Sequence, residues 1–437
     1  MRKVSKSLCF FAVLLAGCAP YSAHDRASLS KALTERGAVA LRSGGTDFSL
    51  PPGVALGDGL TEDDVVATAL WNNARFQVDL TALGFARADL VEAGMIRNPL
   101  FTLLTPLGPK QLEMTAWLPI EALWQRPKKV AAAQVEVERV ASSLVQTGLD
   151  LVRDAKVAFA EAALANDRIR LARDAEALRG KLMRIAEARR KSGDLSELEL
   201  SSVRLDLRRA EQDVLRLTRE ELAARERLAA VMGASVEQLG SIRLADPEPR
   251  QTSEPAQLVT EALALRPDLR AAELAIDAAQ QRGGAAVAAS FPQVNLIADA
   301  NGAGTQGFEA GPGLQAELPI FNQGQGPRAR AEVDLERAQW NYVAAQQRIA
   351  LEVRQAQGRY LLAQESLALL RSQLLGELDV AGAGAAKAYA GGEISLLALL
   401  DTTRQQLEAH QREAELVAEV RRAAAELDRS VGRKRVR

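Results

Sequence analysis

The sequence has few of the residues that usually build chemical sites. Among its 437 residues there are only two cysteines and two histidines. The histidines, His24 and His410, are far apart and lack the i, i+4 spacing that places two metal ligands on one helix face. We therefore expect no catalytic residue, no metal site and no cofactor, and we interpret His410 as a solvated or seam residue of a helix.

An excess of charge of either sign is also absent. There are 55 Lys and Arg against 56 Asp and Glu, which gives a net charge of -1. A nucleic-acid-binding protein would normally carry a basic excess, and a disordered acidic chain would combine low hydrophobicity with a large net charge. With 47% hydrophobic residues the sequence fits neither class, so we expect no nucleic-acid partner.

Long apolar runs are missing as well. The basic start Met1–Lys6 is followed by a short apolar run, Leu8–Ala16. This run is typical of an export signal, because a helix that spans a bilayer needs about 20 apolar residues. No run of 18 apolar residues occurs elsewhere. Membrane insertion of the mature chain, beyond a lipid anchor, must therefore use β-strands.

The first residues also resemble a bacterial lipoprotein signal. The segment Leu15–Cys18 resembles a lipobox, in which cleavage precedes the cysteine and its thiol takes up a diacylglycerol. This predicts that Cys18 is the lipidated mature N-terminus, and Ala19 after it implies sorting to the outer membrane. The alternative is an ordinary cysteine inside a signal peptide. Cys9 would leave with the signal, so we expect no disulfide in the mature chain.

Proline is absent from two long stretches, Lys128–Asp246 and Arg328–Arg437, although the chain contains 16 prolines. Because proline costs about 3 kcal/mol inside a helix, this distribution predicts very long helices. Apolar residues spaced alternately by three and four favour a coiled-coil seam in the first stretch, with one polar break at Glu221. The other seam residues are Leu200, Val203, Leu207, Ala210, Val214, Leu217, Ala224, Leu228 and Val231.

The sequence contains two copies of one unit. Ala69–Phe76 matches Ala262–Leu269 at an offset of 193, and Gly193–Ser196 matches Gly392–Ser395 at an offset of 199. Matches that keep their order and nearly keep their offset indicate a repeat. Each copy is predicted to hold a helix, a proline-bounded insert, and two long helices joined at a glycine-marked turn. The predicted domains are a signal peptide (1–17), a lipidated extended tether (18–59), a first repeat (60–233, with a β-hairpin at about 99–119 and long helices at about 126–233), a linker (234–255), a second repeat (256–432, with a β-hairpin at about 292–320 and long helices at about 327–432) and a basic tail (433–437).

Both inserts alternate in polarity as β-strands do. In the second insert the strands flank a glycine-rich turn, predicted over Asn301–Gly313. One apolar and one mostly polar face are typical of transmembrane barrel strands, and the alternative is a soluble hairpin packed on a core. The first hairpin has about eight residues per strand, which is short of the 9 to 11 usually needed. The residues predicted to face lipid are Val294, Leu296, Leu314, Leu318, Phe101, Leu103, Met114 and Leu118, and those predicted to face a lumen are Asn295, Asp299, Gln315 and Glu317.

Several phrases of the sequence resemble the TolC-like outer membrane efflux protein family, in its lipoprotein form. The resemblance covers residues 58 to 432. The phrases are Arg266–Glu273 at the opening of the second repeat, Phe291–Val294 at strand entry, Leu318–Gly324 at strand exit, Tyr389–Gly392 with Leu399–Asp401 at the distal helix turn, and Leu427–Gly432 at the last helix end.

The resemblance implies a mainly α fold with membrane β-structure. Long coiled-coil hairpins would form a trimeric α-barrel, and four transmembrane strands per protomer would complete a 12-stranded β-barrel. The implied function is the passive exit duct of a tripartite efflux pump, lipid-anchored in the cell outer membrane with a long periplasmic extension, and not an enzyme. The implied partners are two further copies in a homotrimer, a periplasmic adaptor (membrane fusion) protein, an inner-membrane efflux pump and outer membrane lipid. Four strands alone would leave open edges in lipid, which agrees with a trimer.

The resemblance also implies a periplasmic gate where the helix pairs turn, at Lys191–Glu199 and Tyr389–Asp401. In the family, a tyrosine on the second turn bonds to a carboxylate on the first, and acidic residues ring the aperture. Aligned by the turn glycines, these residues are Tyr389, Glu199 and Asp401. Two family residues are missing, because the basic position is Ile394 and the other ring acid is Ala398. Alternatively, Glu199 and Asp401 are ordinary solvated helix residues.

Two other functions are compatible with parts of the sequence. A lipid-anchored periplasmic coiled-coil scaffold would need only the long helices, and the amphipathic inserts argue against it. A lipid-anchored enzyme would need a catalytic site that the sequence does not contain.

Overall fold

The computed structural model describes residues 20–433, apart from 37–39, 43, 56–58, 106–111, 243–246, 248–252, 290–292 and 303–306. The predicted signal peptide, the lipidation site Cys18 and the tail beyond Arg433 therefore lie outside the described residues. So do the predicted turn at Gly108-Pro109 and the strand entry at Phe291-Pro292.

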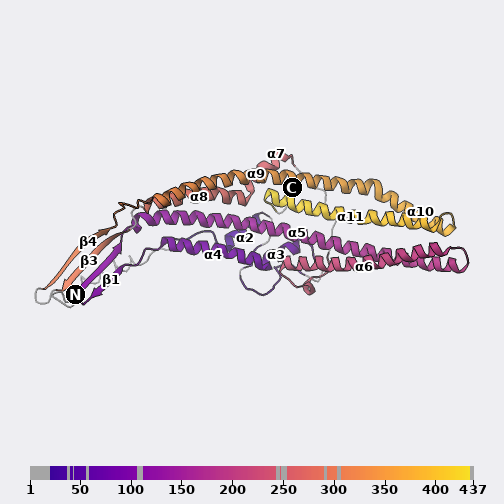
Figure 1. The fold of residues 1–437 in the computed structure, drawn as a ribbon, viewed down its shortest axis with the longest axis horizontal. Helices are drawn as coiled ribbons and strands as arrows, with labels where there is room; N and C mark the ends of the chain where they lie inside the picture. Colours follow the sequence, from indigo (N-terminus) through magenta and orange to yellow (C-terminus); the bar gives the residue numbers. More distant parts are fainter. Residues whose placement is uncertain are drawn as a thin grey trace. The chain divides into compact units, whose positions relative to one another are not determined.

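The elements follow one another in similar order in the two halves of the chain (Figure 1). The first half contains α2 (Arg26–Glu35), α3 (Glu62–Asn72), α4 (Ala74–Gly94), β1 (Leu100–Leu104), β2 (Leu112–Pro119), α5 (Ala122–Lys191) and α6 (Glu197–Met232). The second contains a short 3-10 helix (Val236–Gln238), α7 (Pro255–Leu265), α8 (Pro267–Ala288), β3 (Val294–Gly302), β4 (Phe308–Ala316), α9 (Gln325–Leu369), α10 (Gly376–Gly391) and α11 (Leu396–Val431). A π-helical segment, Leu370–Leu375, joins α9 to α10.

The chain divides into two compact units. The strand unit holds the described parts of Met1–Leu29, Asp79–Leu144 and Pro267–Gln347, and the helical unit holds those of Ser30–Val78, Val145–Arg266 and Arg348–Arg437. Each unit takes segments from both halves of the chain. The compact units therefore do not coincide with the predicted repeats, whose boundaries stay a prediction.

The long helices confirm what the distribution of proline predicts. Helix α5 has 70 residues and α6 and α11 have 36 each. Glycine ends two of the long helices in the left-handed region, with φ of 87° at Gly193 and 79° at Gly392. A residue with a Cβ rarely adopts this conformation, so these two glycines allow the chain to reverse between α5 and α6 and between α10 and α11.

The helix predicted before each insert is in fact two helices. The first break falls at Asn73, whose side chain accepts a hydrogen bond from the Phe76 amide at 3.0 Å. The second falls at Arg266, which has ψ of 124° and precedes Pro267. Proline disfavours the helical conformation in the residue before it, so α7 ends there and α8 begins with the proline.

The predicted extended tether is wrong for part of its length, because residues 26–35 form α2. Leu29 and Leu33, four residues apart, are 2% and 0% exposed. A Cβ built on Gly148 of α5 would lie 2.8 Å from the Leu33 side chain, so this leucine packs directly on the helix. Farther along, the Trp71 indole nitrogen donates to the Ser49 hydroxyl at 3.0 Å. From Ser30 onward the segment is therefore packed into the helical unit.

Burial along α6 follows the predicted seam. Leu200, Val203, Ala210, Leu217 and Leu228 are all at most 6% exposed. Asp206 is buried beside the predicted position Leu207, which is only half-buried. In the part of the chain that the structure describes, none of the helices combines the length and apolar composition needed to cross a membrane.

Candidate functional site

The four strands form one antiparallel sheet in the order β1-β2-β3-β4. Leu118 pairs with Leu296, which pairs in turn with Leu314, and Leu103 pairs with Met114. Directly opposed residues share a face of the sheet. One face therefore carries every residue of the strands that is predicted to face lipid, namely Phe101, Leu103, Met114, Leu118, Val294, Leu296 and Leu314. Leu318 lies beyond the last residue of β4.

The opposite face carries all of the charge that the strands contain. Its charged residues are Glu113, Asp299 and Glu309, and the predicted lumen residues Asn295 and Gln315 lie there too. Asp299 accepts hydrogen bonds from the Thr115 hydroxyl at 2.8 Å and the Asn301 amide at 2.7 Å. Glu317 lies just past β4, and its backbone N–H extends the ladder by donating to the Gln293 carbonyl at 3.0 Å.

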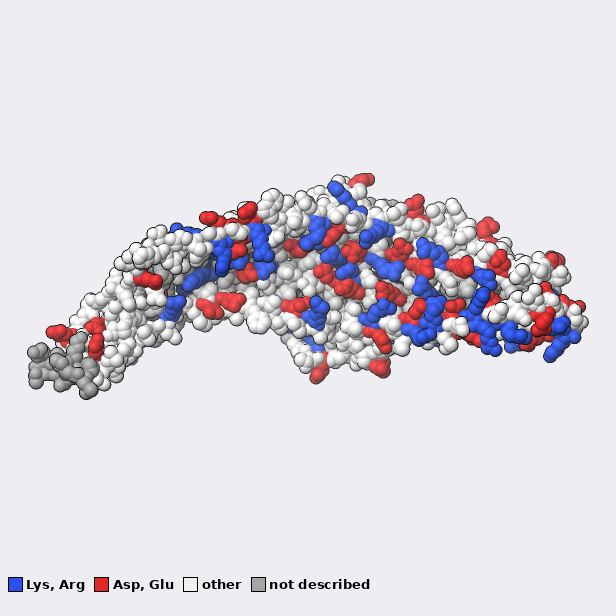
Figure 2. Space-filling model, viewed as in Figure 1, with Lys and Arg blue, Asp and Glu red and all other residues white. Residues whose placement is uncertain are grey.

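This second face is less polar than the sequence pattern predicts. Four apolar residues lie on it among the polar ones, Leu100, Leu104, Trp117 and Ile297. The first face is nevertheless the more apolar, and it is open: Leu314 is 68% exposed, Phe101 62% and Leu296 45%. Figure 2 shows few charged side chains over the strands, whereas basic and acidic side chains intermingle over the helices. An exposed apolar face of this extent is typical of a surface that contacts a membrane or another protein.

The predicted turn at Asn301–Gly313 is too long, because β3 reaches Gly302 and β4 already begins at Phe308. Gly311 and Gly313 pair with Asp299 and Ile297 as ordinary ladder residues. Pro312 is tolerated because β4 is an edge strand of the sheet in this chain, where a missing N–H costs no ladder bond on the open side. The strand also ends at Ala316, so the predicted hairpin end near Ile320 is wrong.

A second candidate site lies where the two helix hairpins of the helical unit turn, α5 into α6 and α10 into α11 (Figure 1). Buried side chains from both turns form one apolar cluster. Its members are Leu182, Met183, Ala186, Leu195, Leu200, Val203, Tyr389, Leu396, Leu399 and Leu400. The structure thus brings together the two turns that the sequence predicts to meet.

Tyr389 lies inside this cluster and is 4% exposed. Its buried hydroxyl has no hydrogen-bond partner among the described residues. The Arg189 guanidinium carbon lies 4.4 Å from the centre of the Tyr389 ring, within the range of a cation–π contact. The same arginine donates to the Tyr389 carbonyl at 3.4 Å. Sequence reasoning missed Arg189, since nothing in the local pattern indicates a contact across 200 residues.

Glu199 does not contact Tyr389 in this conformation. Its carboxylate closes a capping box at the start of α6, accepting from the Ser196 amide at 2.9 Å and the Ser196 hydroxyl at 2.7 Å. The hydrogen bond from the Ser196 hydroxyl is the larger cause, and together with the bond from the Ser196 amide it holds the pKa of Glu199 below its usual value. Asp401 is exposed on α11 and accepts from the Gln405 amide one turn later at 3.0 Å.

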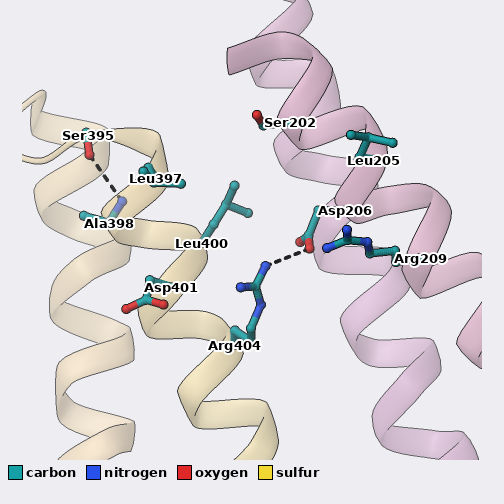
Figure 3. A pocket seen from close by; sticks show the side chains of 10 residues that line it. All are labelled: Ser202, Leu205, Asp206, Arg209, Ser395, Leu397, Ala398, Leu400, Asp401 and Arg404. Carbon is teal, nitrogen blue, oxygen red and sulfur yellow. Dashed lines mark hydrogen bonds and ion pairs between the residues drawn. The ribbon is translucent and has the colours of Figure 1, made fainter. Parts of the chain in front are cut away.

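A groove of about 650 Å³ separates α6 from α11 next to the turns (Figure 3). Leu205, Asp206 and Arg209 line one wall, and Leu400, Asp401 and Arg404 line the other. Asp206 binds Arg404 across the groove at 3.1 Å and Arg179 of α5 at 2.8 Å. Sequence reasoning missed this trio, because Asp206 sits one residue before a predicted seam leucine.

His410 links α11 to α10 rather than projecting only into solvent. Its Nε2 lies 3.1 Å from the Asp379 carboxylate, which also accepts from the Gln406 amide at 2.8 Å. The hydrogen bonds from Gln406 and then His410 lower the pKa of Asp379. Among the described residues no group of His, Cys, Asp and Glu is arranged to hold a metal ion.

Comparisons with known proteins agree with these features. A sequence model described as "Outer membrane efflux protein" matches residues 258–433. The cobalt-zinc-cadmium resistance protein CzcC of Cupriavidus metallidurans is 24% identical over 86% of this chain and 90% of its own. The probable outer membrane lipoprotein SilC of Salmonella typhimurium is 29% identical over 34% of each chain. The solved structure of the outer-membrane channel OprN superimposes with a TM-score of 0.71 at 22% identity, covering 89% of this chain and 94% of the channel.

Proposed function

Because this chain belongs to the outer membrane efflux protein family, we propose that it is the exit duct of a tripartite efflux pump. The chain lies in the outer membrane, with its helical part in the periplasm. In the proposed function it conducts substrates passively from an inner-membrane pump and the periplasm to the exterior. The observation that carries this proposal is the sheet register, which gathers the exposed apolar residues on one face and all strand charge on the other.

The proposed membrane part is a β-barrel made by three copies of the chain. β1 and β4 are the outer strands of the sheet, and each has an unpaired edge in this chain. Unpaired backbone groups are costly in lipid, so the edges must be covered. A homotrimer would pair β4 of one copy with β1 of the next and close a 12-stranded barrel. The apolar face would then meet lipid and the charged face the lumen.

The proposed anchor is a lipid on Cys18, which would hold the mature N-terminus in the outer membrane. The support is the lipobox-like segment, and part of the family shares this form, as the name of SilC indicates. A labelled fatty acid should be incorporated by the native chain and lost in Cys18→Ser. Retention of the label by the variant would exclude this anchor.

The proposed gate lies at the clustered helix turns, with Tyr389, Glu199 and Asp401 as its polar residues. A buried hydroxyl that lacks a partner costs about 1–3 kcal/mol. The Tyr389 hydroxyl is in that condition. A conformation in which Glu199 leaves Ser196 and accepts a hydrogen bond from this hydroxyl would remove that cost. We propose that the periplasmic adaptor docks on the same turns, with the pump behind it.

The proposed cargo rests on the name of a similar protein rather than on residues of this chain. CzcC, which matches over most of this sequence, is named for resistance to cobalt, zinc and cadmium. We therefore propose metal cations as cargo. Deletion of the gene should lower the tolerated concentrations of these three metals, and unchanged tolerance of all three would point to another cargo.

Single-channel recording in a planar bilayer tests the central proposal. The purified protein should give discrete conductance steps, because a closed barrel encloses a water-filled path. A lipid-anchored scaffold, the alternative function, would bind the bilayer and give none. The matched control is Leu296→Arg, which should not insert, so steps that appear in both samples would come from contaminants.

A further inference from the structure

Asp206 is a buried charge in the coiled-coil seam of α6. The residue is 9% exposed, and its carboxylate binds two arginines from two other helices. The Arg179 Nε of α5 lies 2.8 Å from Oδ2, and the Arg404 Nη2 of α11 lies 3.1 Å from Oδ1 (Figure 3). A carboxylate is expensive to bury unless it is compensated in this way. Asp206 therefore joins the first helix hairpin to the second.

The two arginines differ in how easily they can leave. The Arg179 side chain is only 16% exposed and belongs to the same hairpin as Asp206. The Arg404 side chain is 46% exposed and reaches across the groove from the other hairpin. If α11 moves away from α6, water can solvate Arg404 at once, while Arg179 still neutralises Asp206. The link can thus open without leaving a bare buried charge.

A second ion pair between the two hairpins is buried on both sides. Lys156 of α5 and Asp428 of α11 lie 2.8 Å apart with side chains only 6% and 3% exposed. Lys156 also lies 3.8 Å from Glu62, but separating Lys156 from Asp428 would still pull apart two nearly buried charges, which is unfavourable. The second hairpin is therefore held firmly at Lys156–Asp428, between α5 and α11, and the releasable contact is Asp206–Arg404, between α6 and α11 nearer the turns.

We propose that Asp206 is a latch residue that holds the two hairpins together through Arg404 and keeps Arg179 as its permanent partner. This inference rests on the proposed duct function and extends it. It assigns the resistance of the closed end to opening to a positioning residue about two and a half helix turns after the start of α6. The chain has Ile394 and Ala398 at two of the family's gate positions.

The test is the bilayer conductance of Arg404→Met, which removes the releasable partner and leaves Asp206 paired with Arg179. Loss of one half-exposed ion pair should raise the open fraction about fivefold. Arg404→Lys should restore the native value, because it keeps the cation. Arg412→Met is the matched control: it removes the same charge from α11, and Glu415, its partner on the same helix, keeps its bond to Arg168 of α5.

Melting temperature and trimer mass separate a latch from a structural role. The latch is supported if Arg404→Met gains conductance and Arg412→Met does not, while the melting temperature and the trimer mass are the same in both variants. Equal conductance in the two variants overturns it, as does a lower melting temperature without a gain in conductance. If the native protein forms no channel, the proposed function fails and the latch with it. If the native protein forms a channel and Arg404→Met has the same conductance, only the latch is contradicted and the proposed duct function stands.

Discussion

The buried hydroxyl of Tyr389 is the residue-scale feature with the clearest consequence for the gate. Its ring is held by the apolar cluster and by Arg189, while the hydroxyl has no partner among the described residues. The nearby Glu199 carboxylate is exposed and engaged with Ser196. The hydroxyl can therefore gain a partner, and the carboxylate can exchange Ser196 for another one.

We expect Tyr389→Phe combined with Glu199→Ala to raise conductance in bilayers, because the pair can then no longer close the gate. Single-channel recording of the intact trimer measures the effect. The control is Tyr342→Phe with Glu220→Ala, which deletes the same groups elsewhere; Tyr342 there bonds only locally, to Gln346, and Glu220 to Arg216. Native conductance in the Tyr389–Glu199 double variant would remove both residues from the gate.

At this scale the sequence predicts positions better than partners. It places Tyr389 at the second helix turn and Leu200 in the seam that begins after the first, and one apolar cluster contains both. It cannot predict Asp206 between Arg179 and Arg404, because that trio depends on three helices packing in one register. A coiled-coil seam is predicted from the spacing of apolar residues, so a charged residue inside the seam is recognised only when its partners are known.

At the scale of the element, the sheet register places neighbouring residues of β3 on opposite faces of the sheet. Leu296 lies on the apolar face between Leu118 and Leu314, and Asn295 lies on the opposite face beside Gln315. An arginine facing lipid near the bilayer midplane costs roughly 2–4 kcal/mol per site, and a trimer would incur that cost three times.

We therefore expect Leu296→Arg to abolish insertion and trimer assembly, whereas Asn295→Arg should be tolerated. Heat-resistant trimer in outer membrane fractions is the measurement, and Leu296→Ala serves as the control for loss of the leucine itself. If both arginine variants assemble equally well, β3 is not a barrel strand, and the soluble-hairpin interpretation of the inserts is favoured.

Elements are predictable where a physical signal is continuous along the chain. Long proline-free stretches gave the long helices, and glycine marked both distal turns. The errors arise where tertiary contact overrides a local pattern: the glycines of β4 are held by pairing with β3, and α2 is held by burial of Leu33 against α5. The π-helical segment Leu370–Leu375 contains no glycine or proline that could indicate it.

For the whole molecule, the proposed trimer depends on the two outer edges of the sheet. Successive N–H groups along a strand point to opposite sides, so in β1 one set faces β2 and the other faces outward. In a single chain the outward set has no partner in the sheet, because β1 is an edge strand. In a closed trimeric barrel the same groups would pair with β4 of the next copy.

A proline scan of β1 distinguishes these two cases. Proline removes one N–H, and Thr102 and Leu103 are neighbours whose N–H groups point to opposite sides. In a closed barrel both Thr102→Pro and Leu103→Pro should make the trimer less stable than its alanine control, since each removes one ladder bond on one side of the strand. Thr102→Ala and Leu103→Ala control for the lost side chains, and light scattering in detergent gives the mass. If only one proline variant differs from its alanine control, one side of β1 is unpaired and the chain does not close a barrel with its copies.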